Sequence, residues 1–337
     1  MKWARGLFVL VLAGALAGCG AGSGNSEPSG ASEAAGSPEA SGGQASSAAA
    51  QESGEKRTIE HAMGSVTLEK PPERIVLLFN GAVDNAVALG VKPAGAVESW
   101  EEKPWYEFLR DKMEGVVNLG EETQPNIEAI VSLKPDLIIG AKSRHEKIYP
   151  QLSEIAPTLM TENVFDWKSN LKLGAQAMYK EKEAEQLLQE WDRKVAEFKE
   201  KTGSALGSKE VSLIRFESDG SARIYITGFA GTIFQELGLA RPKSQQVEGK
   251  TVINLTSKEQ MEQLDGDYIF DITRFTEGDE SRQQTKDAWT THPLWNSLKG
   301  VKAGHYYPVD VVTWNLSAGI LAAQHLLDDL SKIVGTE

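Results

Sequence analysis

An arginine and a histidine lie just past the carboxyl end of an apolar strand in the segment "DLIIGAKSRHEKIYP", residues 136–150. Open α/β sheets keep their ligand crevice at the carboxyl ends of their strands, so Arg144 and His145 stand where a ligand would be expected. A guanidinium donates paired hydrogen bonds to carboxylate-like oxygens and does not lose its charge. Alternatively, Arg144 caps the helical stretch that follows or pairs with Glu146. His145 should alternate away from Arg144 if the segment is extended.

Two further candidates come from a pair of strands later in the chain. Arg215 lies near the carboxyl end of the apolar strand 210–216, where a charged side chain is costly unless it reaches a partner or a wet cleft. An arginine paired inside its own lobe is the alternative interpretation. On the strand 222–227, Arg223 and Tyr225 share one face. Tyr225 is the expected ligand contact, and Arg223 is expected to face solvent or a partner in the lobe.

One spacing occurs twice in the chain. Glu128 precedes Asp136 by eight residues, and Glu259 precedes Asp267 by eight residues. Each segment has the pattern of a short helix, a turn and a buried strand, which is typical of an internally duplicated unit. An arginine follows the aspartate by eight residues in the first segment and by seven, as Arg274, in the second. Coincidence between two generic helix–strand units is the alternative.

Sequence motifs of the common enzyme classes are missing. The five histidines form no HExxH or His-x-His motif, and the chain contains no GxSxG and no Walker loop. No catalytic residue and no metal site on the protein are therefore predicted. The formal net charge of −13 argues against nucleic acid and against an anionic lipid surface as partners.

The N-terminal region is typical of an exported and tethered protein. Residues 1–18 combine early cations, a short apolar run and small residues, which indicates a signal peptide. The only cysteine, Cys19, ends the tetrapeptide "LAGC", which resembles the bacterial lipobox. This resemblance implies a lipid on Cys19 and a membrane anchor, whereas an incidental thiol in a discarded signal is the alternative. Residues 19–55 are rich in Gly, Ser and Ala, contain no aromatic residue, and are predicted to be a disordered tether.

The elements that must position the candidate residues form two α/β lobes. Short apolar strands alternate with helical stretches, which predicts Rossmann-like lobes with parallel sheets covered on both faces. Between them, apolar residues at helical spacing predict one long helix over residues 181–201, about 31 Å in length. A ligand cleft is expected between the lobes. The predicted domains are an N-terminal lobe at 56–167, a connecting helical segment at 168–203 and a C-terminal lobe at 204–337.

Several motifs in combination resemble one family across nearly the whole folded region. The motifs are "PERIVLL", "ALGVKPAG", "PNIEAIVSLKPDLIIGAKSRHEKIYPQLSEIAPT", "VSLIRF", "ARIY" and "WNLSAGILAAQHLLDDL". They resemble the helical-backbone (class III) substrate-binding proteins of ABC importers, in the iron-siderophore branch, and most of all lipoproteins of the Gram-positive type. The resemblance implies two lobes joined by one helix. It also implies a ferric siderophore of the hydroxamate or citrate-hydroxamate type as ligand, no intrinsic cofactor, an ABC permease as partner, and a position on the outer face of the cell membrane.

A ferric siderophore surrounds its iron with hard oxygen donors, so the protein needs to recognise an oxygen-rich and often anionic shell. Arginines suit this task. The resemblance supports an arginine facing the ligand at Arg215, and it matches Trp314 to a tryptophan of the family's terminal motif. The predicted ligand contacts are Arg144, Arg215, Tyr225, Phe229, Trp314 and His145.

The resemblance also implies a role for the duplicated glutamates. Members of the family present one surface carboxylate on each lobe to arginines of the permease. The matching positions are Glu128 and Glu259, and matched charges on both lobes suit a pseudo-symmetric importer. Two ordinary solvated glutamates are the alternative.

The sequence departs from the family pattern at two places, both expected near the cleft. Ser317-Ala318-Gly319 stands where paired glycines are usual, and residues 271–284 form a polar segment. These departures leave the identity of the ligand open. A haem- or corrinoid-binding protein on the same scaffold is one alternative, and a surface-tethered enzyme is another.

Overall fold

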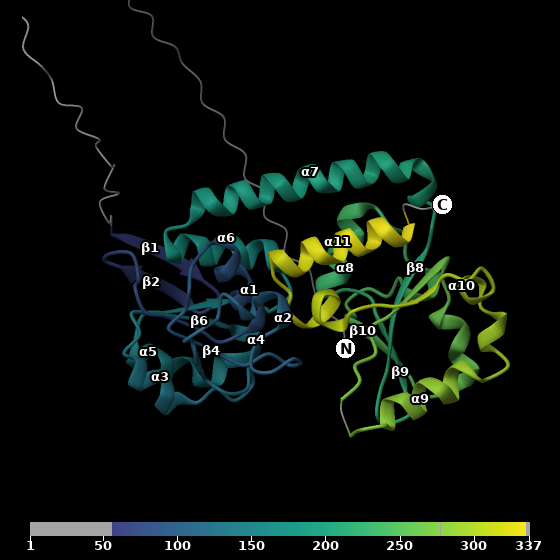
Figure 1. Ribbon diagram of the computed structural model, residues 1–337, viewed down its shortest axis with the longest axis horizontal. Helices are drawn as coiled ribbons and strands as arrows, with labels where there is room; N and C mark the ends of the chain where they lie inside the picture. Colours follow the sequence, from purple (N-terminus) through teal and green to yellow (C-terminus); the bar gives the residue numbers. More distant parts are fainter. Residues whose placement is uncertain (1–55, 277, 335–337) are drawn as a thin grey trace, which may run out of the picture. The chain divides into compact units, whose positions relative to one another are not determined.

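A computed structural model of the chain describes residues 56–276 and 278–334 (Figure 1). The predicted signal peptide, Cys19 and the tether lie outside the described residues. The described part consists of two α/β lobes, each with a five-stranded sheet, and a separate antiparallel hairpin of β1 (Arg57–His61) and β2 (Gly64–Leu68).

The sheet of the first lobe is entirely parallel, in the order β5-β4-β3-β6-β7. Every residue of its central strands is buried, as expected for a parallel sheet covered on both faces. Along β3, Ile75 and Leu77 belong to the cluster that includes α1 and α6, whereas Val76 packs with residues of α3 and α5. The elements are β3 (Ile75–Leu77), α1 (Asn80–Ala88), β4 (Gly95–Ala96), α2 (Glu107–Arg110), β5 (Val117–Asn118), α3 (Ile127–Leu133), β6 (Leu137–Ala141), α4 (Lys142–His145), η1 (Glu146–Ile148), α5 (Tyr149–Ile155), β7 (Thr158–Thr161) and α6 (Trp167–Met178).

The sheet of the second lobe is mixed, in the order β10-β9-β8-β11-β12. Strands β8, β11 and β12 are parallel, but β9 is antiparallel to both of its neighbours. Only residues 217–221 join β8 to β9, whereas a parallel pair needs a crossover of about a dozen residues or more. The elements are β8 (Val211–Phe216), β9 (Ala222–Tyr225), α8 (Phe229–Leu237), η2 (Lys243–Gln245), β10 (Val252–Leu255), η3 (Lys258–Leu264), β11 (Tyr268–Asp271), α9 (Ser281–Thr290), η4 (Trp295–Ser297), α10 (Lys299–Lys302) and β12 (Tyr306–Pro308).

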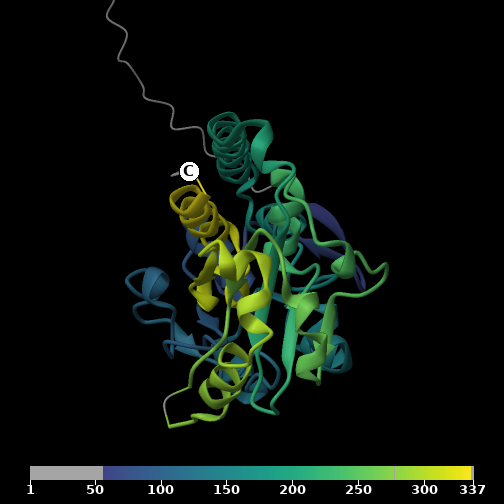
Figure 2. The same cartoon turned by 90° about the vertical axis from the view of Figure 1, so that its right-hand side faces the viewer.

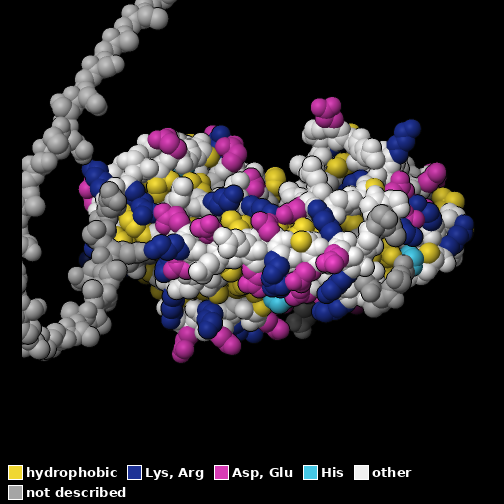
Figure 3. Space-filling view, turned by 90° about the horizontal axis from the view of Figure 1, so that it is seen from above, with side chains coloured by type: hydrophobic (Ala, Val, Ile, Leu, Met, Phe, Trp, Pro, Cys, Tyr) yellow, Lys and Arg dark blue, Asp and Glu magenta, His cyan; other side chains and the backbone are white. Residues whose placement is uncertain are grey.

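The long connecting helix is present as α7 (Glu181–Leu206), with non-helical dihedral angles at Gly203. It leads the chain from α6 to the first strand of the second lobe (Figure 1). Its apolar face is buried, whereas the face seen from above carries interspersed Lys, Arg, Asp and Glu side chains (Figure 3). The final helix, α11 (Ile320–Val334), follows a π-helical turn, Val312–Leu316, and packs beside α7 (Figure 2). Because α11 also contacts α1, α6 and α8, it touches helices of both lobes.

The duplicated spacing corresponds to equivalent contacts in the two lobes. Asp136 accepts a hydrogen bond from the backbone N–H of Arg74, directly before β3, at 2.8 Å. Asp267 accepts one from the backbone N–H of Glu210, directly before β8, at 2.8 Å. In both lobes the strand that follows the aspartate pairs in parallel with the strand that follows the N–H donor. This equivalence supports duplication of one supersecondary unit.

The buried carboxylate of Asp84, on α1, caps the first turn of α11. Its oxygens accept hydrogen bonds from the backbone N–H groups of Leu321 (2.8 Å) and Ala322 (3.0 Å) and from the hydroxyl of Ser317 (2.9 Å). Burial raises the pKa of Asp84 to about 6, while these hydrogen bonds act in the opposite direction. A Cβ atom at Gly319 would lie 2.4 Å from the Asp84 Cβ, so this close contact requires a glycine. The Ser317-Ala318-Gly319 segment therefore joins the last helix to the first lobe.

We expect Asp84→Ala to lower the free energy of unfolding by about 2 to 4 kcal/mol. The substitution leaves two N–H groups at a helix start and one hydroxyl without their acceptor, and each buried unsatisfied group costs about 1 to 3 kcal/mol. Removal of a buried charge offsets part of this loss. Urea unfolding monitored by circular dichroism measures the change. The exposed Asp111→Ala is the control, and equal stability of the two variants would contradict the capping role.

Candidate ligand-binding site

A cavity of about 410 Å³ lies between the two lobes. Its walls come from residues at or just beyond the carboxyl ends of strands in both lobes, from residues 251–252 at the start of β10, and from the segment that leads into α11. A volume of this size suits a small molecule. The lining residues are Gly81, Trp100, Glu122, Arg144, Val164, Phe165, Arg215, Tyr225, Thr227, Gly228, Phe229, Thr251, Val252, Arg274, Asn315, Leu316, Ser317 and Ala318.

Arg144 lines the cavity from the first lobe, on the short helix α4 that follows β6. Its Nε atom donates to the carboxylate of Glu122 at 3.2 Å, so its partner is not Glu146. The side chain of Glu122 is only 3% exposed and also accepts hydrogen bonds from the backbone N–H (3.0 Å) and side-chain amide (2.9 Å) of Asn80. The side chain of Arg144 remains 40% exposed. Glu122 therefore fixes one end of the guanidinium and leaves Arg144 accessible to a ligand.

His145 is buried and does not line the cavity. Its Nδ1 atom accepts a hydrogen bond from the backbone N–H of Ala141 at 3.1 Å, and its Nε2 atom donates to the carbonyl of Glu122 at 2.8 Å. Burial is the main reason that the pKa of His145 is lowered. The ring thus joins the loop of Glu122 to the end of β6, which differs from the direct ligand contact expected from the sequence.

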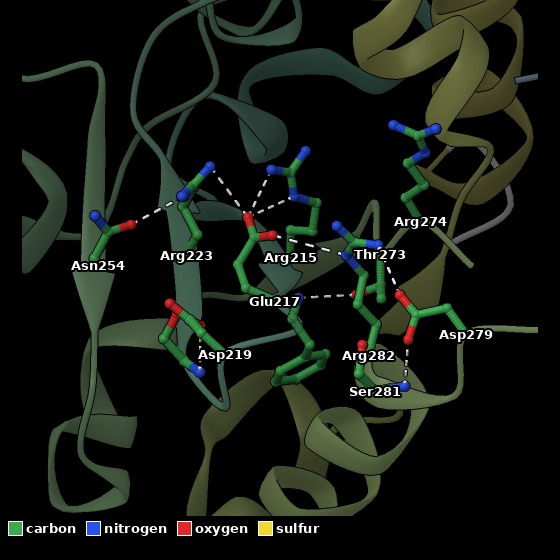
Figure 4. A network of polar contacts seen from close by, with 12 residues as sticks. Arg215, Glu217, Asp219, Arg223, Asn254, Thr273, Arg274, Asp279, Ser281 and Arg282 are labelled. Carbon is green, nitrogen blue, oxygen red and sulfur yellow. Dashed lines mark hydrogen bonds and ion pairs between the residues drawn. The ribbon is translucent and has the colours of Figure 1, made fainter. Parts of the chain in front are cut away.

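Arg215 lines the cavity from β8 of the second lobe. Its Nε and Nη2 atoms reach the carboxylate of Glu217 at 2.8 Å and 2.6 Å (Figure 4). Its guanidinium also lies 5.2 Å from the ring centre of Tyr225. Tyr225 also lines the cavity, and burial raises its pKa. The two interpretations of Arg215 both hold, because it pairs inside its own lobe and also faces the cavity.

Arg274 joins the two lobes across the cavity. It lies in the loop after β11, donates to the backbone carbonyl of Trp100 at 2.8 Å, and pairs with the carboxylate of Glu101. Its pKa is lowered, first by burial and then by the nearby charge of Arg282. The spacing argument pointed to Arg274, but its partner in the other lobe was not predicted.

The two aromatic candidates differ in their positions. Phe229, the first residue of α8, lines the cavity. Trp314 does not: it is fully buried, its ring centre lies 4.9 Å from that of Phe270, and its Nε1 atom donates to Asp329 at 3.3 Å. It belongs to the core beneath the segment that forms the cavity wall. Trp100 is the tryptophan that lines the cavity.

Two acidic partners of the cavity-lining arginines were not identified from the sequence. Glu122 and Glu217 follow strands β5 and β8, as Arg144 and Arg274 follow β6 and β11, but acidic residues are too frequent in this chain for that position to distinguish them. Glu128 and Glu259 are both exposed and lie at the start of α3 and of η3, respectively.

Within residues 56–276 and 278–334, no cluster of three or more His, Cys, Asp or Glu side chains could hold a metal ion. No helix in the same part of the chain has the length and apolar character needed to cross a bilayer.

Comparison with known proteins identifies relatives that cover most of this chain. A probable siderophore-binding lipoprotein of Bacillus subtilis (strain 168), YfiY, is 42% identical over 294 residues, which cover 85% of this chain and 90% of the relative. The achromobactin-binding periplasmic protein of Dickeya dadantii (strain 3937) is 37% identical over 268 residues, or 78% of this chain and 87% of the relative. These relatives are named as binding proteins.

A solved structure has the same fold. Staphylococcus aureus SirA, complexed with staphyloferrin B, matches with a TM-score of 0.80 and 40% identity, covering 83% of this chain and 99% of SirA. The predicted fold class of two α/β lobes is thereby confirmed. A family model described as periplasmic binding protein matches residues 75–311. With a match over most of its length and relatives at this level of identity, the chain belongs to the periplasmic binding protein family.

Proposed function

We propose that the protein captures a ferric siderophore outside the cytoplasm and delivers it to an ABC permease without chemical conversion. The observation that carries this proposal is the set of three arginines, Arg144, Arg215 and Arg274, that line one cavity between the lobes. The names of the relatives YfiY and SirA support it, because the first is described as siderophore-binding and the second was solved with a siderophore.

The charge of the cavity favours chelated iron over the bare ion. Three guanidinium groups and one carboxylate, that of Glu122, line the cavity, so a free Fe³⁺ ion would be repelled. A chelate that presents carboxylate or hydroxamate oxygens offers acceptors to the arginines and apolar surface to Trp100, Phe165 and Phe229. A citrate-hydroxamate complex fits this lining best, because its carboxylates can accept paired hydrogen bonds from a guanidinium. Haem is less suited, since the lining residues include no histidine or methionine, and burial raises the pKa of the lining tyrosine, Tyr225, which disfavours the tyrosinate that would bind haem iron.

Fluorescence titration tests the binding function directly. We expect ferric aerobactin, a citrate-hydroxamate complex, to quench the tryptophan fluorescence saturably, because Trp100 lines the cavity. Iron-free aerobactin and bare ferric iron should quench weakly. Ferric desferrioxamine B, a trihydroxamate, and ferric staphyloferrin B complete the panel. Saturable binding of none of the ferric complexes, or a Soret band that develops with haem instead, would reject the proposal.

The lipid anchor at Cys19 remains part of the proposal and leads to a prediction about localisation. We expect full-length Cys19→Ala protein to be found in the soluble extracellular fraction or as uncleaved precursor, because a thioether-linked lipid cannot form at alanine. Cell fractionation and the mass of the mature N-terminus distinguish these products from the parent. Ser23→Ala serves as the control. If fully processed Cys19→Ala protein stays on the membrane, the lipoprotein assignment is wrong.

A further inference from the structure

One buried carboxylate in the second lobe is surrounded by three arginines (Figure 4). The side chain of Glu217 is only 10% exposed. Its carboxylate oxygens lie 2.6 Å from Nη2 of Arg215, 3.1 Å from Nη1 of Arg223 and 3.8 Å from Nε of Arg282. Of the three arginines, only Arg215 lines the cavity. Glu217 itself does not, so it acts behind the cavity wall.

The geometry restricts the orientation of Arg215. Its Nε and Nη2 atoms point to the same carboxylate oxygen of Glu217, and its guanidinium also lies against the ring of Tyr225. A guanidinium is planar, so two contacts on its side edge leave the terminal edge, with Nη1 and the second N–H of Nη2, for another acceptor. Preorganisation of this kind raises affinity because the ligand need not order the side chain.

Glu217 and its three arginine partners, Arg215, Arg223 and Arg282, form an arginine cluster with an excess of positive charge. Three arginines surround one carboxylate, and the other acid that pairs with Arg282 among the described residues is Asp279, which is 4.0 Å away and 46% exposed. The side chain of Arg223 is held in addition by the amide oxygen of Asn254 at 2.9 Å. Without Glu217 the guanidinium groups would repel each other and lose their common anchor.

We propose that Glu217 is a positioning residue of the binding site, which orients Arg215 toward the ligand and holds the arginine cluster together. This inference rests on the proposed function, since it concerns how the same cavity recognises an anionic ferric complex. If Glu217 orients Arg215, removing its carboxylate should lower the affinity for the ligand. Net charge alone predicts the opposite change, because a buried carboxylate behind the cavity should repel an anionic ligand and its removal should tighten binding.

The sign of the change therefore separates the two explanations. We expect Glu217→Gln to weaken the binding of ferric aerobactin by about tenfold or more, although the substitution makes the site more positive. The decisive variant is Glu217→Gln with Arg223→Gln, which removes one charge of each sign and leaves the net charge of the cluster as it is in the parent. We expect it to bind as weakly as the single variant, whereas the charge argument predicts affinity like that of the parent. Arg223→Gln alone measures what the loss of that arginine contributes, and the double variant should bind more weakly than Arg223→Gln, whereas the charge argument predicts tighter binding.

A double-mutant cycle tests whether Glu217 acts through Arg215. In an Arg215→Ala background, Glu217→Gln should have almost no further effect on the dissociation constant. A purely structural role would lower affinity equally in both backgrounds. Thermal unfolding of each variant identifies loss of fold, and Glu217→Asp, which keeps the charge and shortens the side chain, should retain intermediate affinity.

The outcomes distinguish this inference from the proposed function. If the parent binds none of the ferric complexes, both fall together. If the parent binds ferric aerobactin and the Glu217→Gln variant binds it equally or more tightly, only the positioning role of Glu217 is overturned. An undiminished effect of Glu217→Gln in the Arg215→Ala background has the same consequence.

Discussion

Replacing Arg144 and Arg215 together by alanine is expected to weaken the binding of ferric aerobactin by about 100-fold or more. Each arginine lines the cavity from a different lobe and has its own buried counter-ion, Glu122 or Glu217. A lost charged hydrogen bond costs about 1.5 to 3 kcal/mol, and contributions from separate sites add approximately. Since about 1.4 kcal/mol corresponds to tenfold in affinity, the pair should account for at least two orders of magnitude. Fluorescence titration measures the two single variants and the double variant.

The companion variants of this experiment control for fold and for charge. Arg144→Ala leaves the buried carboxylate of Glu122 without its cationic partner, which is destabilising in itself. Arg144→Ala combined with Glu122→Gln removes that charge and should bind as weakly while remaining folded. Arg193→Ala with Lys201→Ala removes two exposed cations from α7 and should bind like the parent. Parent-like binding by the folded Arg144→Ala, Arg215→Ala variant would show that the ligand occupies another site.

Reversing the charge of Glu128 and Glu259 together is expected to abolish most iron uptake while ligand affinity stays nearly unchanged. Both glutamates are exposed, and neither lines the cavity. Charges on the surface act mainly within a Debye length of about 8 Å at physiological ionic strength, so binding in the cavity should not respond. If the permease presents arginines to these positions, Glu128→Arg with Glu259→Arg sets like charges against each other, which costs several kcal/mol. Uptake of labelled iron and surface binding are compared in one strain.

The single reversals and a matched pair on another face complete this test. A single reversal should reduce uptake less than the double variant, because one lobe can still dock. Glu190→Arg with Glu200→Arg introduces the same charge change on the exposed face of α7 and should transport normally. Normal uptake by the Glu128→Arg, Glu259→Arg variant would mean that both are ordinary solvated residues. Loss of ligand binding in the same variant would assign them to the fold instead.

The class of fold and the general position of the site could be predicted from the sequence because they depend on local patterns. Continuous apolar runs such as those of β6 and β8 can be buried on both faces only in a sheet covered by helices, and the periodic apolar face of α7 requires a long helix. Parallel strands bring their carboxyl ends to one edge, so Arg144 and Arg274 could be expected near a cleft. The short connection between β8 and β9 also contains enough information to exclude parallel pairing, although the alternation of apolar runs had suggested one sheet type for both lobes.

The partners of the charged residues were decided only by the tertiary structure. Arg144 pairs with Glu122 and Arg274 with Glu101, residues 22 and 173 positions away, and such pairs depend on how loops from different strands and lobes meet. Likewise, Trp314 belongs to the terminal motif that resembles the family but lies in the core. Its burial could not be predicted because the exposure of an aromatic ring depends on the helices packed around it. The sequence alone determines which residues can recognise an anionic ligand, since that follows from side-chain chemistry and strand position. Which of them face the cavity, and which buried acid orients each, depends on long-range packing that no local pattern encodes.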